Sequence, residues 1–425
     1  MRGMAGRTRR FATRAVVLAV TASLFVGWVW AGAPAASQAP VTITFTYWGN
    51  PEMDAAFLKL VEEFEKSHPA IKVNPVRIPS KYYDKLMTMI AGGTAPDVAM
   101  LAFSEVPRFV EAGALAPIDG FVAESGYPKH DLFPVVIEGF SYNGKLYGLP
   151  RSFSPFVLYY NKKMFQERGL TASSDWTWAE FLEVAKKATT FRPGGPWGFA
   201  GNIEEDGVFY PEWLFPFVWQ NGGEVVDPVR LVSRVMAPET KEAIAFYVDL
   251  FQKHKVAPTS VQAQTYGGSD AMFLSGRAAM IMESYVLVAS ARSQANLEFD
   301  VVRLPHQKQR ASVAFPIGYV IPAASKHPQE AWQFLAYLGG PEGQKIIPQL
   351  GIGVPGLMSM AYSDLFLQPG QQPQNAVALL EQSKTARLLP ATVPKFGQWY
   401  TAMRQELATV MSGEEPLESV LPRMD

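Results

Sequence analysis

Hydrophobic and polar residues follow two different periods after residue 40. Strand-like alternation of β-branched or aromatic residues is interrupted by segments with apolar residues at helical spacing. The predicted strands are residues 41–48, 71–76 and 97–101. The predicted helices are residues 55–66 and 82–91. This order predicts a mostly parallel sheet with helices on both faces. Ligands of such sheets bind beyond the carboxyl ends of the strands, so we expect binding residues at 48–52 and 102–105.

The next segment indicates a passage between two lobes. Asn143 and Gly144 lie between residues of high strand propensity, which predicts a tight hairpin at 142–147. Residues 156–160 are apolar without alternation, as is typical of a strand covered on both faces. The polar elbow at 151–155 therefore leads from one lobe into another, and its side chains should face the gap, where small ligands bind.

A second short apolar run, residues 315–322, is broken by Gly and Pro like the first and predicts a second crossing. Residues 213–223, which include Trp213 and Trp219, are apolar enough to be core and stop at a Gly pair. Within residues 276–285 we expect a helix end, a turn and a buried strand with Glu283 and Tyr285 at its tip, and another strand is expected at 299–304. Further helices are expected at 178–188, 239–253, 328–338, 376–382 and 398–411.

Composition narrows the class of protein. A chain of 425 residues favours about two domains. Charged residues are 18% and the net charge is −1, which gives no basic face for nucleic acid. The 10 Trp exceed what packing alone usually needs, so some of them are expected to line a ligand cleft. The absence of Cys excludes disulfides, thiol catalysis, thiolate metal sites and lipid attachment to a cysteine.

The amino terminus predicts export. Five Arg precede an apolar run at 15–30, and small residues follow at 33–35, which is typical of a signal peptide occupying residues 1–35. The alternative is an uncleaved anchor, because Trp28 and Trp30 lengthen the apolar run. Without a cysteine for lipidation, we expect a mature protein that is free in the periplasmic space.

Signals for catalysis are poor. The five His are scattered without metal-ligand spacing, and neither Gly-x-Ser-x-Gly nor a phosphate-binding Gly-rich loop is present. We therefore expect no cofactor and no metal.

Several short motifs, in order, resemble the family 1 extracellular solute-binding proteins of ABC importers, the group that includes the maltose-binding protein. The matching stretches are Tyr47-Trp48-Gly49, Phe64-Glu65-Lys66, residues 91–98, Ala112-Gly113-Ala114-Leu115, residues 143–150, Tyr159-Tyr160-Asn161-Lys162, Thr177-Trp178-Ala179-Glu180, Asn221-Gly222-Gly223, residues 273–280 and Glu342-Gly343. Each motif alone is weak, but together they cover nearly all of the chain after the signal.

The resemblance implies an α/β fold of two lobes, the type II periplasmic-binding-protein fold, with a hinge of three crossings. It implies that residues 36–152 and 319–365 form one lobe and residues 156–314 and 370–425 the other. The third crossing, near residues 365–374, comes from the resemblance alone.

Sugars present apolar ring faces and hydroxyl edges, so a sugar site needs stacking aromatics and paired hydrogen-bonding groups. Combined with the resemblance, this predicts ligand contacts from both lobes. The predicted ligand-binding residues are Trp48, Asn50, Glu52, Ser104, Glu105, Arg151, Phe153, Ser154, Glu283, Tyr285, Gly318, Tyr319 and Trp399. Ser154 departs from the family, which often has an acid there, and Ile317 stands where a second glycine is common. Trp213 and Trp219 are expected in the core.

These observations predict a monomeric receptor that closes around a mono- or oligosaccharide and delivers it to membrane permease subunits without breaking a bond. One alternative is the same fold binding glycerol phosphate, a polyol or a polyamine. Another is an exported glycosidase or lyase that uses Glu52 and Glu283 as paired carboxylates.

Overall fold

A mixed sheet of six strands, in the order β14-β6-β13-β3-β1-β2, combines four strands from residues 41–153 with two from residues 317–355. In the computed structural model, residues 39–192, 194–204, 206–393 and 395–425 are described, and the predicted signal peptide lies outside them. The strands are β1 (Val41–Tyr47), β2 (Ile71–Arg77), β3 (Val98–Ala102), β6 (Gly148–Phe153), β13 (Ile317–Val320) and β14 (Val354–Pro355). β1 is parallel to β2 and β3, as predicted, but β13, β6 and β14 join antiparallel. The expectation of a mostly parallel sheet is therefore wrong for its second half.

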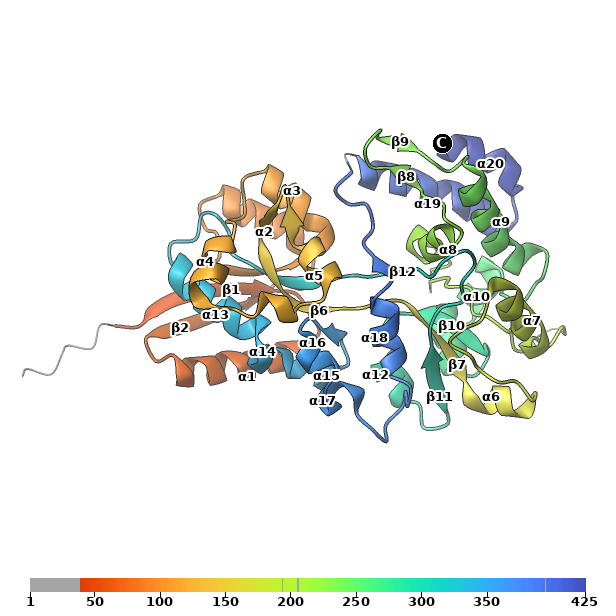
Figure 1. Cartoon of the computed structure of the whole chain (residues 1–425), viewed down its shortest axis with the longest axis horizontal. Helices are drawn as coiled ribbons and strands as arrows, with labels where there is room; N and C mark the ends of the chain where they lie inside the picture. The colour runs from red at the N-terminus through yellow and green to blue at the C-terminus, as the bar shows by residue number, and fades with distance from the viewer. Residues whose placement is uncertain (1–38, 193, 205, 394) are drawn as a thin grey trace, which may run out of the picture. The chain divides into compact units, whose positions relative to one another are not determined.

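Helices cover both faces of this sheet because side chains alternate along β1. Phe45 packs against Phe57 and Phe334 on one face, whereas Thr46 meets the hydroxyl of Tyr82 from the other. Figure 1 shows the two sets of helices on opposite sides of β1 and β2. The helices and the hairpin of this part are α1 (Pro51–Ser67), α2 (Tyr82–Ala91), η1 (Phe103–Glu105), α3 (Val106–Glu111), α4 (Asp119–Ser125), η2 (Lys129–Asp131), α5 (Pro134–Gly139), β4 (Ser141–Tyr142), β5 (Lys145–Leu146), α13 (Pro328–Gly339), α14 (Pro341–Gln344), α15 (Ile346–Leu350), α16 (Met358–Ala361) and α17 (Asp364–Leu367).

A second sheet has three antiparallel strands in the order β10-β7-β11. They are β10 (Met280–Glu283), β7 (Val157–Asn161) and β11 (Phe299–Val302). Its helices are α6 (Lys162–Glu167), α7 (Trp178–Ala188), η3 (Pro211–Trp213), α8 (Phe215–Gln220), α9 (Pro238–Gln252), α10 (Ser260–Thr265), α11 (Gly268–Leu274), α12 (Leu287–Arg292), α18 (Val377–Ser383), α19 (Phe396–Ser412) and α20 (Leu417–Met424). The short strand pairs are β8 (Val226–Asp227) with β9 (Val232–Ser233) and β12 (Ser312–Val313) with β15 (Ala386–Arg387).

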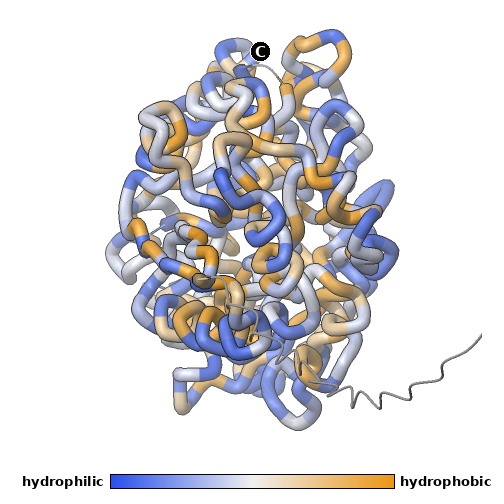
Figure 2. Tube along the Cα trace, turned by 90° about the vertical axis from the view of Figure 1, so that its left-hand side faces the viewer, coloured by the Kyte–Doolittle hydropathy of each residue, from blue (hydrophilic) through white to orange (hydrophobic). Residues whose placement is uncertain are grey.

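Helix boundaries follow local chemistry. α7 begins where the sequence predicts, because Thr177 and Glu180 form a reciprocal capping box. α1 begins four residues earlier than predicted, at Pro51, because Asn50 accepts a hydrogen bond from the Met53 amide and proline suits a first helical position. Figure 2 shows short hydrophobic runs separated by hydrophilic turns along the trace.

The chain passes from one sheet to the other at residues 154–156, between β6 and β7, and back at 314–316, between β12 and β13. Both predicted crossings are present, although Arg151 and Phe153 lie within β6 and not in the elbow itself. The carboxyl-terminal side of α17 reaches the second sheet at Asn375, whose amide donates to the Asp300 carboxylate over 2.8 Å. The third crossing near residues 365–374 and the predicted lobe boundaries stay predictions.

Candidate functional site

The two crossings run side by side. Pro155 and Ala314 form an antiparallel bridge. The Phe315 amide donates to the Ser154 carbonyl over 3.3 Å, and the Phe156 amide donates to the Val313 carbonyl over 3.2 Å. Because these bonds tie the two connections together, residues from both sheets meet at one place.

A run of aromatic rings follows this junction. Phe103, which begins η1 directly after β3 of the first sheet, lies 6.4 Å from Phe315, centroid to centroid. Phe315 lies 5.4 Å from Phe156, whose ring stacks on Trp213 at 6.2 Å and 14°. The run thus joins residues of both sheets through buried rings, of which Phe315 is the most exposed.

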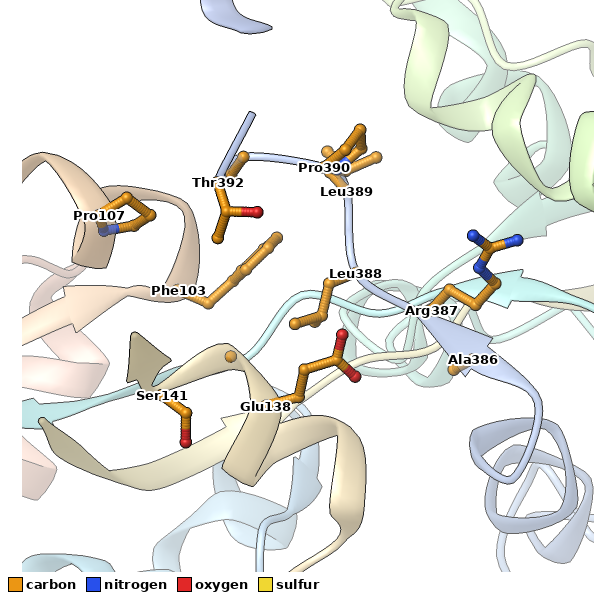
Figure 3. A pocket seen from close by; sticks show the side chains of 12 residues that line it. Phe103, Pro107, Glu138, Ser141, Ala386, Arg387, Leu388, Leu389, Pro390 and Thr392 are labelled. Carbon is orange, nitrogen blue, oxygen red and sulfur yellow. The ribbon is translucent and has the colours of Figure 1, made fainter. Parts of the chain in front are cut away.

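A cavity of about 380 Å³ lies beside this junction. Phe103, Pro107 and Glu138 line one side, and residues 386–392, which begin at β15, line the other. In Figure 3, Phe103 and Leu388 extend toward the space between them, whereas the guanidinium of Arg387 points away. The volume of this cavity is within the range of small-ligand sites. None of the thirteen predicted binding residues lines the cavity.

A smaller pocket, of about 150 Å³, lies in the second part of the chain. Its lining includes Asn202, Trp213 and the carboxylates of Glu204 and Asp270. Asn202 is 1% exposed and Trp213 is 7% exposed, yet Asn202 Oδ1 and Trp213 Nε1 have no hydrogen-bond partner. Buried polar atoms are rarely left without partners, and among the described residues six further side-chain atoms share this state.

Two acids near this pocket hold their protons strongly. Burial, with a contribution from the Asp270 carboxylate, raises the pKa of Glu283 to about 8, although the Ser284 amide donates to its carboxylate over 2.6 Å. Burial likewise raises the pKa of Glu212 to about 7. The Tyr400 hydroxyl donates to Glu212. Of the predicted residues, Glu283 is thus the one that belongs to this acidic group.

The predicted binding residues that follow β1 and β3 are exposed or make contacts within the protein. The ring of Trp48 packs against Tyr82 at 5.0 Å and Tyr83 at 5.5 Å. Asn50 caps α1, and Glu52 is exposed in its first turn. In η1, Ser104 is exposed, and Glu105 accepts from Arg108 over 3.1 Å while burial raises its pKa.

Arg151 is buried without an acidic partner. Its Nε donates to Ser152 Oγ over 3.2 Å, and its Nη1 approaches the sulfur atoms of Met53 and Met100 at 3.6 and 3.5 Å. Within the described part of the chain, no carboxylate oxygen lies within 4.0 Å of its guanidinium. Burial lowers its pKa. Its side chain therefore retains capacity to donate hydrogen bonds.

Other predicted contacts lie in the core of the first sheet. Phe153 packs on Phe133 at 4.8 Å. Tyr319 is fully buried, 5.9 Å from Phe45. A Cβ on Gly318 would lie 2.3 Å from the Leu149 carbonyl oxygen, so the neighbouring strand accounts for this glycine.

The remaining predicted residues make contacts within the protein. Ser154 is buried in the first crossing. Tyr285 lies beyond the end of β10, because the strand ends at Glu283 and not at 285, and its ring packs on Phe366 at 5.1 Å. The indole nitrogen of Trp399 donates to the Met424 carbonyl over 3.0 Å. Both rings thus contribute to packing in the structure.

Sequence reasoning missed Glu212 and Asp270 and assigned Trp213 to the core. Trp213 is buried, as expected, but it also lines the small pocket. The sequence feature that could have pointed to Glu212 is its position between Pro211 and Trp213, where an acid stands at the start of an apolar run. Among the described residues, no group of three or more His, Asp or Glu is suited to hold a metal ion. No helix among them is long and apolar enough to cross a membrane.

Comparisons with known proteins agree with this architecture. A mannitol-binding protein from Pseudomonas aeruginosa is 26% identical over 359 residues, which cover 79% of this chain and 78% of the relative. A galactooligosaccharide-binding protein from Bacillus subtilis is 24% identical, and the match covers 86% of this chain and 84% of the relative. The ABC substrate-binding protein of Listeria monocytogenes, solved with cycloalternan, superposes with a TM-score of 0.77 at 26% identity, covering 91% of this chain and 97% of that one.

The GacH receptor of Streptomyces glaucescens, solved unliganded and with acarbose, shares the fold with a TM-score of 0.75 at 23% identity, covering 91% of this chain and 97% of that one. The two-lobe fold predicted from the sequence is therefore confirmed. The family model for bacterial extracellular solute-binding proteins matches residues 48–345. The chain belongs to the bacterial extracellular solute-binding protein family.

Proposed function

We propose that this protein is the sugar-binding subunit of an ABC importer, which takes up a mono- or oligosaccharide between its two lobes and delivers it to permease subunits. The observation that carries the proposal is the aromatic run from Phe103 through Phe315 and Phe156 to Trp213, which joins both sheets beside two adjacent crossings. The family and the sugars named for its relatives support it.

The physical basis is a shift in population. A sugar that touches residues of both lobes makes its full set of contacts only when the lobes are close together, so binding favours the closed state. Trp213 and Phe103 offer ring faces, while Glu138 and the unpaired Trp213 Nε1 offer hydrogen-bonding groups for hydroxyls.

We also propose that the protein breaks no bond, acts as a monomer, and works in the periplasmic space after removal of its signal segment. Glu52 is exposed in the first turn of α1 and Glu283 is buried at the end of β10, and neither carboxylate lines the two cavities described above. Chromatography of an oligosaccharide after prolonged incubation with the protein tests whether a bond is broken. The appearance of smaller sugars would contradict the proposal that none is.

Thermal unfolding against a panel of sugars, polyols, polyamines and glycerol phosphate tests the transport role. A ligand at 100 times its Kd adds about 2.7 kcal/mol to the free energy of unfolding. We expect saccharides to give the largest shifts. A clear response to another solute class, with none to any carbohydrate, would overturn the proposal.

A further inference from the structure

Arg151 is a buried cation whose hydrogen-bonding capacity the protein leaves largely unused. It lies in β6 and is 3% exposed. Apart from the bond of its Nε to Ser152, the guanidinium reaches the sulfur atoms of Met53 and Met100, which are weak acceptors. A guanidinium keeps its charge inside proteins. Because an unpaired buried charge is costly, such a group points to a functional site.

The phenol groups near Arg151 do not balance its charge. Burial lowers the pKa of Arg151, and the phenols of Tyr319 and Tyr83 act against this shift. Both phenols are uncharged at neutral pH, because burial raises the pKa of each above its ordinary value. The Tyr319 hydroxyl has no hydrogen-bond partner of its own. The protein therefore supplies no strong acceptor at this place among the described residues.

The acids of this region have other partners or face water. Glu105 is ion-paired with Arg108 over 3.1 Å. Asp54 accepts a hydrogen bond from the Tyr47 hydroxyl over 2.5 Å. Glu52 is exposed in the first turn of α1, where solvent screens its charge. The positive charge of the buried guanidinium is thus left for a ligand.

The contacts of Arg151 place it near the carboxyl end of β1, where ligands of such sheets bind. Met53 lies in the first turn of the helix that follows this strand and is partly buried, whereas Met100 is fully buried. A rotation of the flexible Met53 side chain therefore uncovers the guanidinium without a change in the backbone. The partly buried ring of Trp48 lies 5.5 Å from Tyr83 and offers a surface for a sugar ring.

A ligand that suits this place accepts hydrogen bonds and carries negative charge. A carboxylate only accepts, and its two oxygens match the planar fork of a guanidinium. Its single charge balances one arginine, whereas a phosphate monoester carries about −1.5 to −2 at neutral pH. A neutral sugar would leave the buried charge unpaired.

We propose that Arg151 binds the carboxylate of an acidic saccharide, so that the transported ligand is a uronic acid or an oligosaccharide that contains one. The carboxylate takes the place of the Met53 sulfur beside Nη1, while the sugar ring packs on Trp48. This inference rests on the proposed sugar-binding function and names its ligand class.

Isothermal titration with matched ligands tests the proposal. Galacturonate, glucuronate and digalacturonate are each compared with the methyl ester and with the neutral parent sugar, and the two monosaccharides also with the phosphorylated sugar. We expect the acid to bind at least about tenfold more tightly than the ester or the neutral sugar, since hydrogen bonds to charged groups are the stronger ones. Equal or weaker binding of the acid overturns the proposal, and so does tighter binding of the phosphorylated sugar.

Two variants locate the preference. Arg151→Met removes the buried charge and should bring the ratio of acid to ester affinity close to one. Arg230→Met is the matched control, because Arg230 is exposed between β8 and β9 and its loss changes the net charge equally. The control should keep the preference of the wild type. A preference that persists in a folded Arg151→Met protein contradicts the proposal.

Met53→Ala provides a second test that does not depend on the folding of Arg151→Met. This substitution uncovers the guanidinium and keeps its charge. It should raise the association rate constant of the acid more than that of the ester, as measured by stopped-flow fluorescence, with circular dichroism as the check on folding. An equal change for acid and ester speaks against a carboxylate at this place.

The outcomes separate this inference from the transport role. If neutral saccharides bind and the acids have no advantage, the acidic-saccharide inference fails and the sugar receptor stands. If acetate or citrate stabilises the protein while no saccharide does, both fail.

Discussion

Pro155 and Ala314 are bridge partners in the two chain segments that link the sheets. Hydrogen bonds on both sides of this bridge join Phe315 to Ser154 and Phe156 to Val313. The two crossings therefore form one two-stranded ribbon, so a substitution in either crossing should affect the position of both sheets.

Replacing Phe315 by Ala should weaken this junction. The ring of Phe315 is half-buried between Phe103 and Phe156, so its loss should lower the free energy of unfolding by about 2 kcal/mol. Urea denaturation measures the change. Phe191→Ala is the matched control, because Phe191 is 66% exposed and should change stability by less than about 0.5 kcal/mol. Equal effects of the two substitutions would show that the ring contacts at the junction contribute nothing.

Gly318→Ala separates a structural glycine from one that admits a ligand. The added Cβ would lie 2.3 Å from the Leu149 carbonyl oxygen and 2.6 Å from Phe140, so we expect a loss of about 3 kcal/mol in stability. Gly397→Ala is the control, because nothing lies within 4 Å of that position. A stable Gly318→Ala protein with weakened sugar binding would instead support the role that the family resemblance implies.

Arg151→Met should raise stability and impair binding. The guanidinium is buried without a carboxylate, and methionine has a similar length and an apolar character suited to its neighbours Met53 and Met100. We expect a gain of about 1 kcal/mol in the free energy of unfolding together with a lower affinity for saccharides. Thermal unfolding and titration measure the two effects. A large loss of stability would indicate that Arg151 holds the fold together.

The stability of the protein should depend on the ionisation of Glu283. The folded protein keeps this proton up to a pKa of about 8, whereas the unfolded chain loses it near the ordinary value of 4.5. The contribution of Glu283 to the free energy of unfolding is therefore complete below pH 4.5 and falls as the pH rises toward 8. The charges of Asp270 and Glu204 also act on Glu283, so a variant is needed to isolate this group.

Glu283→Gln retains an acceptor for the Ser284 amide but cannot ionise. It should match the wild-type stability at pH 4 and exceed it increasingly between pH 5 and pH 8, as measured by urea denaturation. Glu124→Gln, at an exposed position of α4, controls for the loss of one negative charge. Parallel profiles for the wild type and Glu283→Gln would contradict the prediction.

The sequence predicted elements best where short-range chemistry decides them. The start of α7 follows from Thr177 and Glu180, and the two crossings follow from apolar runs interrupted by Gly and Pro. The direction of β13 was missed, because antiparallel pairing with β3 and β6 depends on residues more than 150 positions apart. No local pattern contains that information.

The site was harder to predict for the same reason. Asn202, Trp213 and Asp270 meet only after three separate segments fold together. Trp213 follows the pattern of a core residue and is indeed buried, so its free indole nitrogen could not be anticipated. The opposite error occurs at Tyr319. The family resemblance predicted a ligand contact for this residue, whereas packing in the sheet buries its ring completely.

The stacking of Trp213 on Phe156 makes one indole an intrinsic optical reporter. Its emission depends on the polarity and the ring contacts around it, and both change when a guest enters the adjoining pocket. Subtracting the spectrum of a Trp213→Phe variant isolates this signal from those of the other tryptophans, so stopped-flow fluorescence can follow capture of the solute in real time without a dye.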